Sequence, residues 1–360
     1  MTKRILILAP YPQGVAASQR FRFEHYFDAL KKSGYEVRME AFLESKTWSI
    51  LYHSGHYWRK LIGLLGGYWR RFLLLFSLHK FDVLFVHREE SPMFFPMLSW
   101  YFTHVLKKPL IYDFDDAVWL SNSSESNKKF AFLKSHKDSL RLMKWARINA
   151  CGNQFLADQA KSKGSEARII PTVVDTISHH TGMVDHSDSE LCIGWTGSHS
   201  TMRYLEELRP ILAQLKEKIS FKFLFISDEV PDWPELDVHF VPWSKENEVK
   251  ALKQMHIGLM PLPNEEWALG KCGFKLLQYM SVGIVPVAAN VGVNPDLLGN
   301  GERGILCESA SGWFDALFGL SADEGVRQQF AAKCRPYIEA NYSVMSNTDN
   351  FLLLFADLKP

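Results

Sequence analysis

The stretch from Gly270 to Leu298 constrains the fold more than any other part of the chain. It reads GKCGFKLLQYMSVGIVPVAANVGVNPDLL, which predicts a glycine-bearing loop, a helix, an apolar strand and a second glycine turn into another helix. This alternation is typical of a parallel sheet covered by helices on both faces. Lys271 and Lys275 stand at the start of the first helix, where the helix dipole and the first amide groups favour an anion. The stretch therefore predicts a pyrophosphate site as well as a fold class.

The rest of the chain repeats the alternation in two blocks, and 360 residues are more than one core usually serves. We expect an α/β protein with two doubly wound, Rossmann-like domains, residues 1–172 and 190–344, joined by a polar linker, residues 173–189. Strands are predicted at Arg4–Ala9, Phe81–Val86, Pro109–Tyr112, Ile148–Cys151, Arg168–Ile170, Leu191–Trp195, Phe221–Ile226, Val238–Val241, Ile257–Met260, Val285–Ala288 and Gly304–Leu306.

Composition excludes several classes of protein. A net charge of +1 gives no basic field for nucleic acid, and the five cysteines, without a C-x-x-C pair, predict buried free thiols in a reducing compartment. The N-terminus is too short in its apolar run for a signal peptide, and no stretch reaches the ~20 apolar residues of a membrane span. The nearest is Ser91–Leu106. We expect a cytoplasmic protein, with peripheral membrane contact left open.

Ligands of open α/β sheets bind at the carboxyl ends of the strands, so the loops that follow strands are the candidate sites. The first loop contains Gly14, Arg20 and Arg22, but it lacks the G-x-G-x-x-G pattern of nicotinamide binding. It is either a ligand loop or a solvated helix face. The loop after Leu191–Trp195 holds Gly197, Ser198, His199 and Arg203, which suit either a phosphate or a plain helix cap formed by Ser200 or Thr201.

A third loop, DFDDAVW at Asp113–Trp119, brings three carboxylates together after a strand. Three readings stay open for it. The carboxylates could hold Mg²⁺ or Mn²⁺, cap a helix through Asp115 or Asp116, or bind substrate hydroxyls.

These segments, in this order, resemble the retaining glycosyltransferases of family four. The resemblance covers nearly the whole chain and is most specific in IPTVVDT, residues 170–176, and GKCGFKLLQYM, residues 270–280. It implies the GT-B fold, with two facing domains, an interdomain cleft and a C-terminal helix, 345–360, that completes the first domain. It also implies transfer of a hexose from a nucleotide-diphosphate sugar with retention of configuration and without a metal ion or other cofactor. Asp115 and Asp116 are then expected near the transferred sugar.

The resemblance also implies roles for single residues. The donor diphosphate is expected on the first turn of the Gly270 helix, and the nucleobase near the loop at 241–244. Two family glutamates, eight positions apart, fall here on Gly270 and Gln278, so Gln278 is expected at the ribose, and Glu265, Glu266 or Gly270 at the sugar. Catalytic roles are implied for Asp115, Asp116 and Lys271. The expected donor-binding residues are Gly14, Gly197, Ser198, Arg203, Val241, Pro242, Trp243, Lys271, Gly273, Phe274, Lys275, Leu276 and Gln278.

The acceptor side is suggested by Ser45–Phe81, which contains no Asp or Glu but many basic and aromatic residues. This pattern predicts an interfacial helix on an anionic membrane, with an ordinary helix pair and core aromatics as the alternative. We therefore predict a glycan or lipid-linked acceptor and no nucleic-acid partner. A nucleotide-sugar epimerase and a non-catalytic nucleotide- or glycan-binding protein are the alternatives. The expected acceptor or membrane contacts are Arg20, Arg22, Arg59, Lys60, Arg70 and Arg71.

Overall fold

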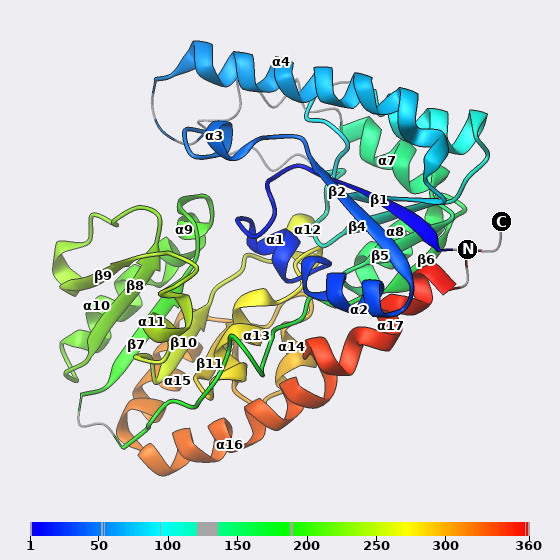
Figure 1. The fold of residues 1–360 in the computed structure, drawn as a ribbon. Helices are drawn as coiled ribbons and strands as arrows, with labels where there is room; N and C mark the ends of the chain where they lie inside the picture. Colours follow the sequence, from blue (N-terminus) through cyan, green and yellow to red (C-terminus); the bar gives the residue numbers. More distant parts are fainter. Residues whose placement is uncertain are drawn as a thin grey trace. The chain divides into compact units, whose positions relative to one another are not determined.

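The structure is a computed structural model that describes residues 2–51, 53, 55–93, 95–120, 136–187, 190–356 and 358. The chain divides into two compact units, Met1–Thr172 with Asn347–Pro360 (unit 1) and Val173–Ser346 (unit 2). Each unit contains one six-stranded parallel sheet flanked by helices (Figure 1). The predicted α/β class with two Rossmann-like doubly wound domains is therefore confirmed. Two residues of the predicted linker, Asp188 and Ser189, lie outside the described residues.

The sheet of unit 1 has the strand order β2-β1-β3-β4-β5-β6. Its central strands are continuous buried runs, as expected for parallel strands covered on both faces. β2 was not predicted, because its sequence YEVRMEA is polar and half exposed at the sheet edge. The strands are β1 Lys3–Ala9, β2 Tyr35–Ala41, β3 Val83–His87, β4 Leu110–Phe114, β5 Ile148–Cys151 and β6 Glu166–Ile169.

Helices cover both faces of this sheet. The C-terminal α17 packs Phe351 and Phe355 against Phe85 of β3, with ring centroids 6.2 and 6.1 Å apart. Figure 1 shows α4 along the other side of the sheet. The helical segments are α1 Ala17–Arg20, η1 Glu24–Tyr26, α2 Phe27–Lys32, α3 Ser45–Trp48, α4 Tyr57–Leu74, η2 Leu75–Lys80, α5 Met97–Trp100, η3 Tyr101–Val105, α7 His136–Trp145, α8 Gln154–Ser162 and α17 Val344–Ala356.

The sheet of unit 2 has the order β12-β11-β10-β7-β8-β9, which is the strand order of dinucleotide-binding sheets. Its strands are β7 Cys192–Thr196, β8 Lys222–Ser227, β9 Val238–Pro242, β10 Ile257–Met260, β11 Val285–Ala289 and β12 Ile305–Cys307. Its helical segments are α9 His199–Leu205, η5 Glu206–Leu208, α10 Arg209–Lys216, η6 Pro234–Leu236, α11 Glu248–Leu252, α12 Glu266–Leu269, α13 Phe274–Ser281, α14 Asn294–Leu298, α15 Ala310–Ala322 and α16 Glu324–Asn341.

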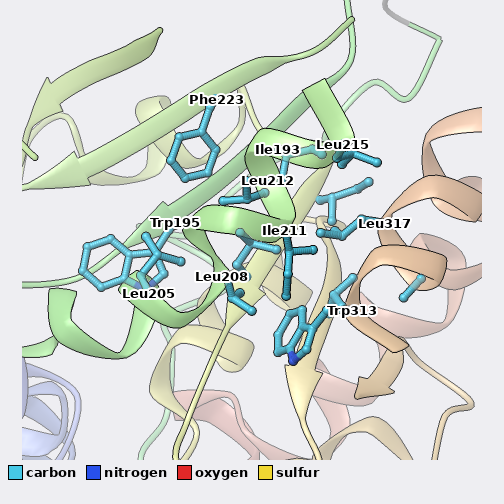
Figure 2. Packing of buried hydrophobic residues seen from close by; sticks show 14 of the residues in the cluster. Ile193, Trp195, Leu205, Leu208, Ile211, Leu212, Leu215, Phe223, Trp313 and Leu317 are labelled. Carbon is cyan, nitrogen blue, oxygen red and sulfur yellow. The ribbon is translucent and has the colours of Figure 1, made fainter. Parts of the chain in front are cut away.

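The main core of unit 2 lies between its sheet and two helices, α10 and α15 (Figure 2). Ile193 and Trp195 alternate along β7 and so point to the same face of the sheet. Leu212 of α10 and Leu317 of α15 are fully buried in the same cluster. Both helices thus bury apolar side chains against the sheet.

Each sheet has a switch point between two neighbouring strands. From one of these strands the chain continues toward one edge of the sheet, and from the other it continues toward the opposite edge. In unit 2 it lies between β7 and β10, which pair only at Ile193–Ile257 and Gly194–Gly258. Beyond these pairs the Tyr279 hydroxyl accepts from the Thr196 N–H and donates to the Leu259 carbonyl, each at 3.2 Å. The ring fits because a Cβ at Gly258 would stand only 2.6 Å from it. In unit 1 the switch point lies between β1 and β3.

One helical segment among the described residues, Tyr57–Lys80, is long and apolar enough to cross a membrane by length and composition, with a mean hydropathy of 1.3. Only 22% of that window is buried. The expectation that no stretch would qualify, with Ser91–Leu106 the nearest, was therefore wrong. The inner side of α4 packs closely, because a Cβ at Gly67 would stand 2.7 Å from the Phe42 carbonyl oxygen.

Candidate functional site

The switch point of unit 2 gathers most of the predicted donor residues. Gly197 follows β7 directly, and its N–H donates to the Ile226 carbonyl at 3.0 Å, which extends the pairing with β8. Ser198 is the N-cap residue of α9, but its hydroxyl lies 2.8 Å from the Ser200 hydroxyl and makes no cap bond. The alternative of a plain cap at Ser200 or Thr201 is therefore wrong.

The loop after β10 places two lysines beside this turn. α13 begins after Gly273, whose φ of +66° is left-handed, and a Cβ there would stand 2.2 Å from Leu297 Cδ1. Only glycine fits this tight entry into the helix. The first turn of α13 is formed by Phe274, Lys275 and Leu276, and Leu276 is fully buried, so it can offer a ligand only its backbone.

Aromatic rings position the cations at this site. The Lys271 ammonium lies 3.8 Å from the centroid of the Trp267 ring, and the Lys275 ammonium lies 5.5 Å from that of Trp195. Arg203 donates to the Tyr204 hydroxyl at 2.7 Å, and the Tyr204 ring stacks on Trp267 at 6.2 Å. Such contacts hold a cation at a defined position by about 0.5–2 kcal/mol each without neutralising it.

The predicted sugar-contact residues surround the same loop. Glu265 is the N-cap residue of α12, Glu266 opens that helix, and both are exposed. Gly270 is buried at the end of α12 with an ordinary helical φ of −73°. The structure therefore brings the carboxylates of Glu265 and Glu266 onto the loop that also contains Lys271.

Gln278 does not stand open to a ligand; it belongs to a buried polar cluster. Its amide nitrogen donates to Glu248 Oε1 at 2.9 Å. The same oxygen accepts from Trp243 Nε1 at 3.1 Å, and Glu248 Oε2 lies 3.2 Å from His179 Nε2. Glu248 at the start of α11 was missed by the sequence analysis, although an acidic residue six positions after the end of β9 was a usable signal. The predicted nucleobase residues Val241, Pro242 and Trp243 lead into this cluster from β9.

A second pair at the strand ends of unit 2 joins His199 and Asp228. Asp228 accepts from the His199 backbone N–H and lies within hydrogen-bond distance of His199 Nδ1, both at 2.7 Å. Partial burial opposes ionisation, but these bonds hold the pKa of Asp228 below its usual range. His199 is therefore an anchored residue at the start of α9 rather than a lone surface histidine.

In unit 1, the Gly14 loop is held by side chains of the helix that follows it. Gly14 has a left-handed φ of 83°, and its N–H donates to Glu24 Oε2 at 2.8 Å. The buried Gln19 amide bonds both the N–H and the carbonyl of Tyr11. Burial raises the pKa of Glu24. The Gly14 amide already has an acceptor in this arrangement.

Arg20 and Arg22 are neither acceptor contacts at the surface nor a solvated helix face. Arg22 is fully buried and donates to Asp113 and to the Ile170 carbonyl. Asp113 also lies 2.6 Å from His87 Nδ1; burial opposes its charge, but Arg22 and His87 outweigh it and lower the pKa of Asp113. Arg20 is 5% exposed. Both predictions were wrong because burial of the loop encloses the side chains that follow it.

Asp115 and Asp116 share one arginine that the sequence analysis missed. Arg88, with a left-handed φ of 59°, donates to Asp115 Oδ1 at 2.7 Å and to Asp116 Oδ2 at 2.8 Å. Burial opposes both charges, yet the pair raises the pKa of Arg88 and lowers that of Asp115. Residues 115–120 form turns, so no helix is capped there within the described residues. The position of Arg88, directly after β3 at the switch point, was the signal that could have found it.

The Asp113, Asp115 and Asp116 carboxylates thus bind arginines, with Asp113 also bonded to His87. Across the part of the chain that the structure describes, no group of three or more His, Cys, Asp or Glu side chains is arranged to hold a metal ion. The five cysteines are free; four are buried and Cys272 is partly exposed.

The basic residues of α4 differ in exposure. Arg71 is 5% exposed and donates to the carbonyls of Ala9, Glu40 and Glu90, so its predicted role at a membrane was wrong. Arg70 pairs with Glu44 at 2.6 Å. Arg59 is exposed and Lys60 partly so, in the first turn of the helix.

Most aromatic residues of α4 face outward, which contradicts the alternative of core aromatics; Tyr68, which packs against Phe42, is the exception. Large apolar side chains recur every three or four residues along one face, and each is at least 42% exposed. We call this set the α4 face. It consists of Trp58, Leu61, Ile62, Leu65, Trp69, Phe72, Leu73 and Phe76.

Comparisons with known proteins bear on the fold and on residues 191–323. Residues 191–323, within unit 2, match the family model described as "Glycosyl transferases group 1". No curated protein sequence matches the chain. Sucrose-phosphate synthase from Thermosynechococcus elongatus has a similar fold, with a TM-score of 0.70 and 13% identity over 99% of each chain. Anabaena HepE with bound UDP has a TM-score of 0.68 and 13% identity, over 99% of this chain and 100% of its own. The galactosyltransferase WaaB of the lipopolysaccharide outer core has a TM-score of 0.63 and 13% identity, with the same coverage.

The fold is therefore that of the two-domain nucleotide-sugar transferases, GT-B. Residues 191–323 match the glycosyl transferases of group 1, and this match supports a transferase enzyme. The predicted resemblance is confirmed at this level, and the narrower family four stays a prediction.

Proposed function

We propose that this glycosyltransferase moves a hexose from a nucleotide-diphosphate sugar to a glycan or lipid-linked acceptor, with retention of configuration and without a metal ion. The observation that carries the proposal is the cationic switch point of unit 2. There Lys275 lies over Trp195, whose ring is next to Gly197, and Lys271 lies over Trp267, all inside the segment that matches the family. HepE has been solved with UDP and with UDP-glucose, so uridine nucleotides are the first donors to test.

The diphosphate would bind at the start of α13. A departing diphosphate gains negative charge as the glycosidic bond breaks, and preorganised cations and amides stabilise that charge most where it develops. Lys271 would leave the face of Trp267 for a phosphate oxygen, and Gly197, Ser198 and Arg203 would complete the site. Gly273 and Phe274 set the backbone that presents the amides.

The nucleoside would extend toward β9. The segment from Val241 to Trp243 would lie beside the base. The buried pair of Glu248 and Gln278 would fix this segment, because Glu248 accepts from the Trp243 indole and from the Gln278 amide.

In unit 2, Glu265 or Glu266 could bind the hydroxyls of the donor sugar. In unit 1, Arg88 fixes the orientation of Asp115 and Asp116, the predicted catalytic pair. With no strong base among these groups, the diphosphate itself would help to deprotonate the acceptor, and the protein would contribute positioning.

The absence of a metal requirement is supported by the arginine partners of the aspartates. Activity should survive a chelator; loss of activity that Mg²⁺ or Mn²⁺ restores would refute this part. Donor class is tested by a thermal-shift screen of nucleoside diphosphates and nucleotide sugars, because a ligand that binds the native state raises its melting temperature. Retention is tested by the anomeric proton signal of the first product formed, which should match that of the donor.

We further propose that the protein contacts the cytosolic face of an anionic membrane through the α4 face. Arg59 and Lys60 lie at one end of it, and each basic residue near an anionic surface contributes about 1 kcal/mol. Replacing both by serine should weaken binding to phosphatidylglycerol vesicles roughly 30-fold at low salt. Binding to neutral vesicles, the matched control, should not change. Equal binding of the wild type and the variant to anionic vesicles would refute the proposal.

A further inference from the structure

A cavity of about 420 Å³ lies in unit 1, between α4 and the start of α5. Its walls are mainly apolar and include Tyr68 and Phe72 of α4 on one side and Phe95, Met97 and Leu98 on the other. None of the roles proposed above uses it.

The polar groups at the edge of this cavity already have partners. The Arg71 guanidinium donates to the Glu90, Glu40 and Ala9 carbonyls at 3.1, 3.1 and 3.3 Å. The Glu90 carboxylate accepts from the N–H groups of Leu98 and Ser99 and from the Ser99 hydroxyl, at 2.6–2.9 Å. These bonds use both groups to tie α4 and α5 to the sheet. What remains for a ligand is apolar wall.

The cavity is continuous with the α4 face. Phe72, Phe95 and Met97 line it and are also 42%, 44% and 41% exposed, so they form its rim. Trp69 and Phe76 contact Phe72 from the outside, each with ring centroids 5.6 Å apart. An apolar chain lying along the α4 face could therefore enter without crossing a polar barrier.

We propose that this cavity binds one hydrocarbon chain, acyl or prenyl, of the lipid-linked acceptor. The proposal rests on the membrane contact proposed above. A dry apolar cavity of about 150 Å³ holds benzene, so this one has room for roughly ten or more chain carbons. A chain gains little on moving from a bilayer into an apolar cavity, because both surroundings are similarly apolar. The cavity therefore acts by position: it holds the lipid beside α4, next to the carboxyl ends of β1 and β2 that Arg71 joins to this helix.

The test uses the full chain and n-alkyl β-glucosides from hexyl to dodecyl, each below its critical micelle concentration, with calorimetry as the readout. Affinity should rise about fourfold per added methylene until the cavity is full. Met97→Trp narrows the cavity and should remove most of this increase. Phe72→Ala widens it and should extend the increase to longer chains. Trp58→Ala, which shortens an exposed side chain of the α4 face outside the cavity, is the matched control and should keep the wild-type series.

The outcomes separate this proposal from the one it rests on. A wild-type chain-length series that persists in Met97→Trp would mean that the glucosides bind on the open α4 face, and would overturn the cavity. Absence of any binding by the wild type would overturn it as well. A series lost in Met97→Trp and extended in Phe72→Ala supports the cavity even if vesicle binding or sugar transfer fails. If the protein binds vesicles but its affinity for glucosides does not rise with chain length, the membrane contact is supported and the cavity proposal is overturned. If Met97→Trp melts early, Phe72→Ala decides the matter by itself.

Discussion

Replacing Gln278 by glutamate is the sharpest test of the buried cluster in unit 2. The resemblance to family four places a glutamate at this position, so sequence comparison predicts a harmless or favourable change. The structure predicts the opposite. The Gln278 amide nitrogen donates to Glu248 Oε1 at 2.9 Å, and the two residues are 2% and 3% exposed. In the variant, two carboxylates would meet at that distance away from water.

The size of the effect follows from two competing costs. Two unit charges about 3 Å apart repel by about 6 kcal/mol at an effective dielectric constant of 20. Keeping one carboxyl protonated at pH 7 costs about 4 kcal/mol, since an ordinary glutamate has a pKa of about 4.3. The second cost is smaller, so the folded variant holds a proton. Its O–H replaces the lost amide donor, and the free energy of unfolding falls by about 4 kcal/mol at pH 7.

The sign of the pH dependence identifies the cause. The folded variant binds this proton more tightly than the unfolded chain does, so the deficit is absent below about pH 4 and grows as the pH rises. For a unit of this size, calorimetry should find a melting temperature about 8–16 °C below the wild type at pH 7 and about 2–4 °C below it at pH 5. Measuring both proteins in parallel cancels titrations that they share.

A swap variant is the control. Glu248→Gln combined with Gln278→Glu restores one carboxylate and one amide and should recover most of the loss. Two results would refute the reasoning. An equal deficit at pH 5 and pH 7 would assign the loss to packing, and no deficit at pH 7 would mean that the two side chains are not in contact.

Three further substitutions test the sites described above. Lys271→Ala should weaken nucleoside diphosphate binding about tenfold or more by calorimetry, whereas Lys218→Ala near the opposite ends of the strands should not; equal effects would remove the phosphate role. Gly273→Ala should lower the free energy of unfolding by about 1–3 kcal/mol, because its φ is left-handed and a Cβ would meet α14. The free energy of unfolding is measured by urea titration. Gly319→Ala, where a Cβ has open space in α15, should leave this free energy unchanged or raise it, and a loss as large as that of Gly273→Ala would contradict the steric argument. Arg88→Met should destabilise the protein at pH 6–7, because it removes the arginine that pairs with two adjacent carboxylates, and the deficit should shrink below about pH 4 as they protonate. A deficit that persists at pH 3 in thermal melts would point to lost packing.

The sequence alone predicted the features that depend on residues close together in the chain. The short apolar runs predicted the central strands, and the glycine and lysines between Gly270 and Lys275 predicted a helix start beside a strand end. Each of these features lies within about ten residues of chain, where helix and strand preferences act directly. β2 was missed because an exposed edge strand does not carry the continuous apolar pattern of its neighbours.

The partners of the site residues depend on distant parts of the chain. Glu248 and Gln278 are 30 residues apart, and Arg22 and Asp113 are 91 apart. Nothing local distinguishes an arginine that will pair inside the protein from one that will face solvent. The strand-end rule would have recovered Arg88, since it directly follows β3 at the switch point, but this requires the strand order, which a single sequence does not supply.

The difference between buried, paired arginines and exposed ones changes how the membrane proposal has to be tested. Neutralising every basic residue of α4 would include Arg71, which joins the helix to the carbonyls of Ala9, Glu40 and Glu90. Each of these bonds has a charged donor and contributes about 1.5–3 kcal/mol, so such a variant would lose vesicle binding by loosening α4 itself. Arg59 and Lys60 hold the helix less, because their side chains are exposed or partly exposed in the first turn, and the bond from Lys60 to the His53 carbonyl, at 2.6 Å, lies at the surface. A charge effect confined to these two, together with unchanged melting, would therefore report attraction to the membrane surface, whereas the broader neutralisation could not.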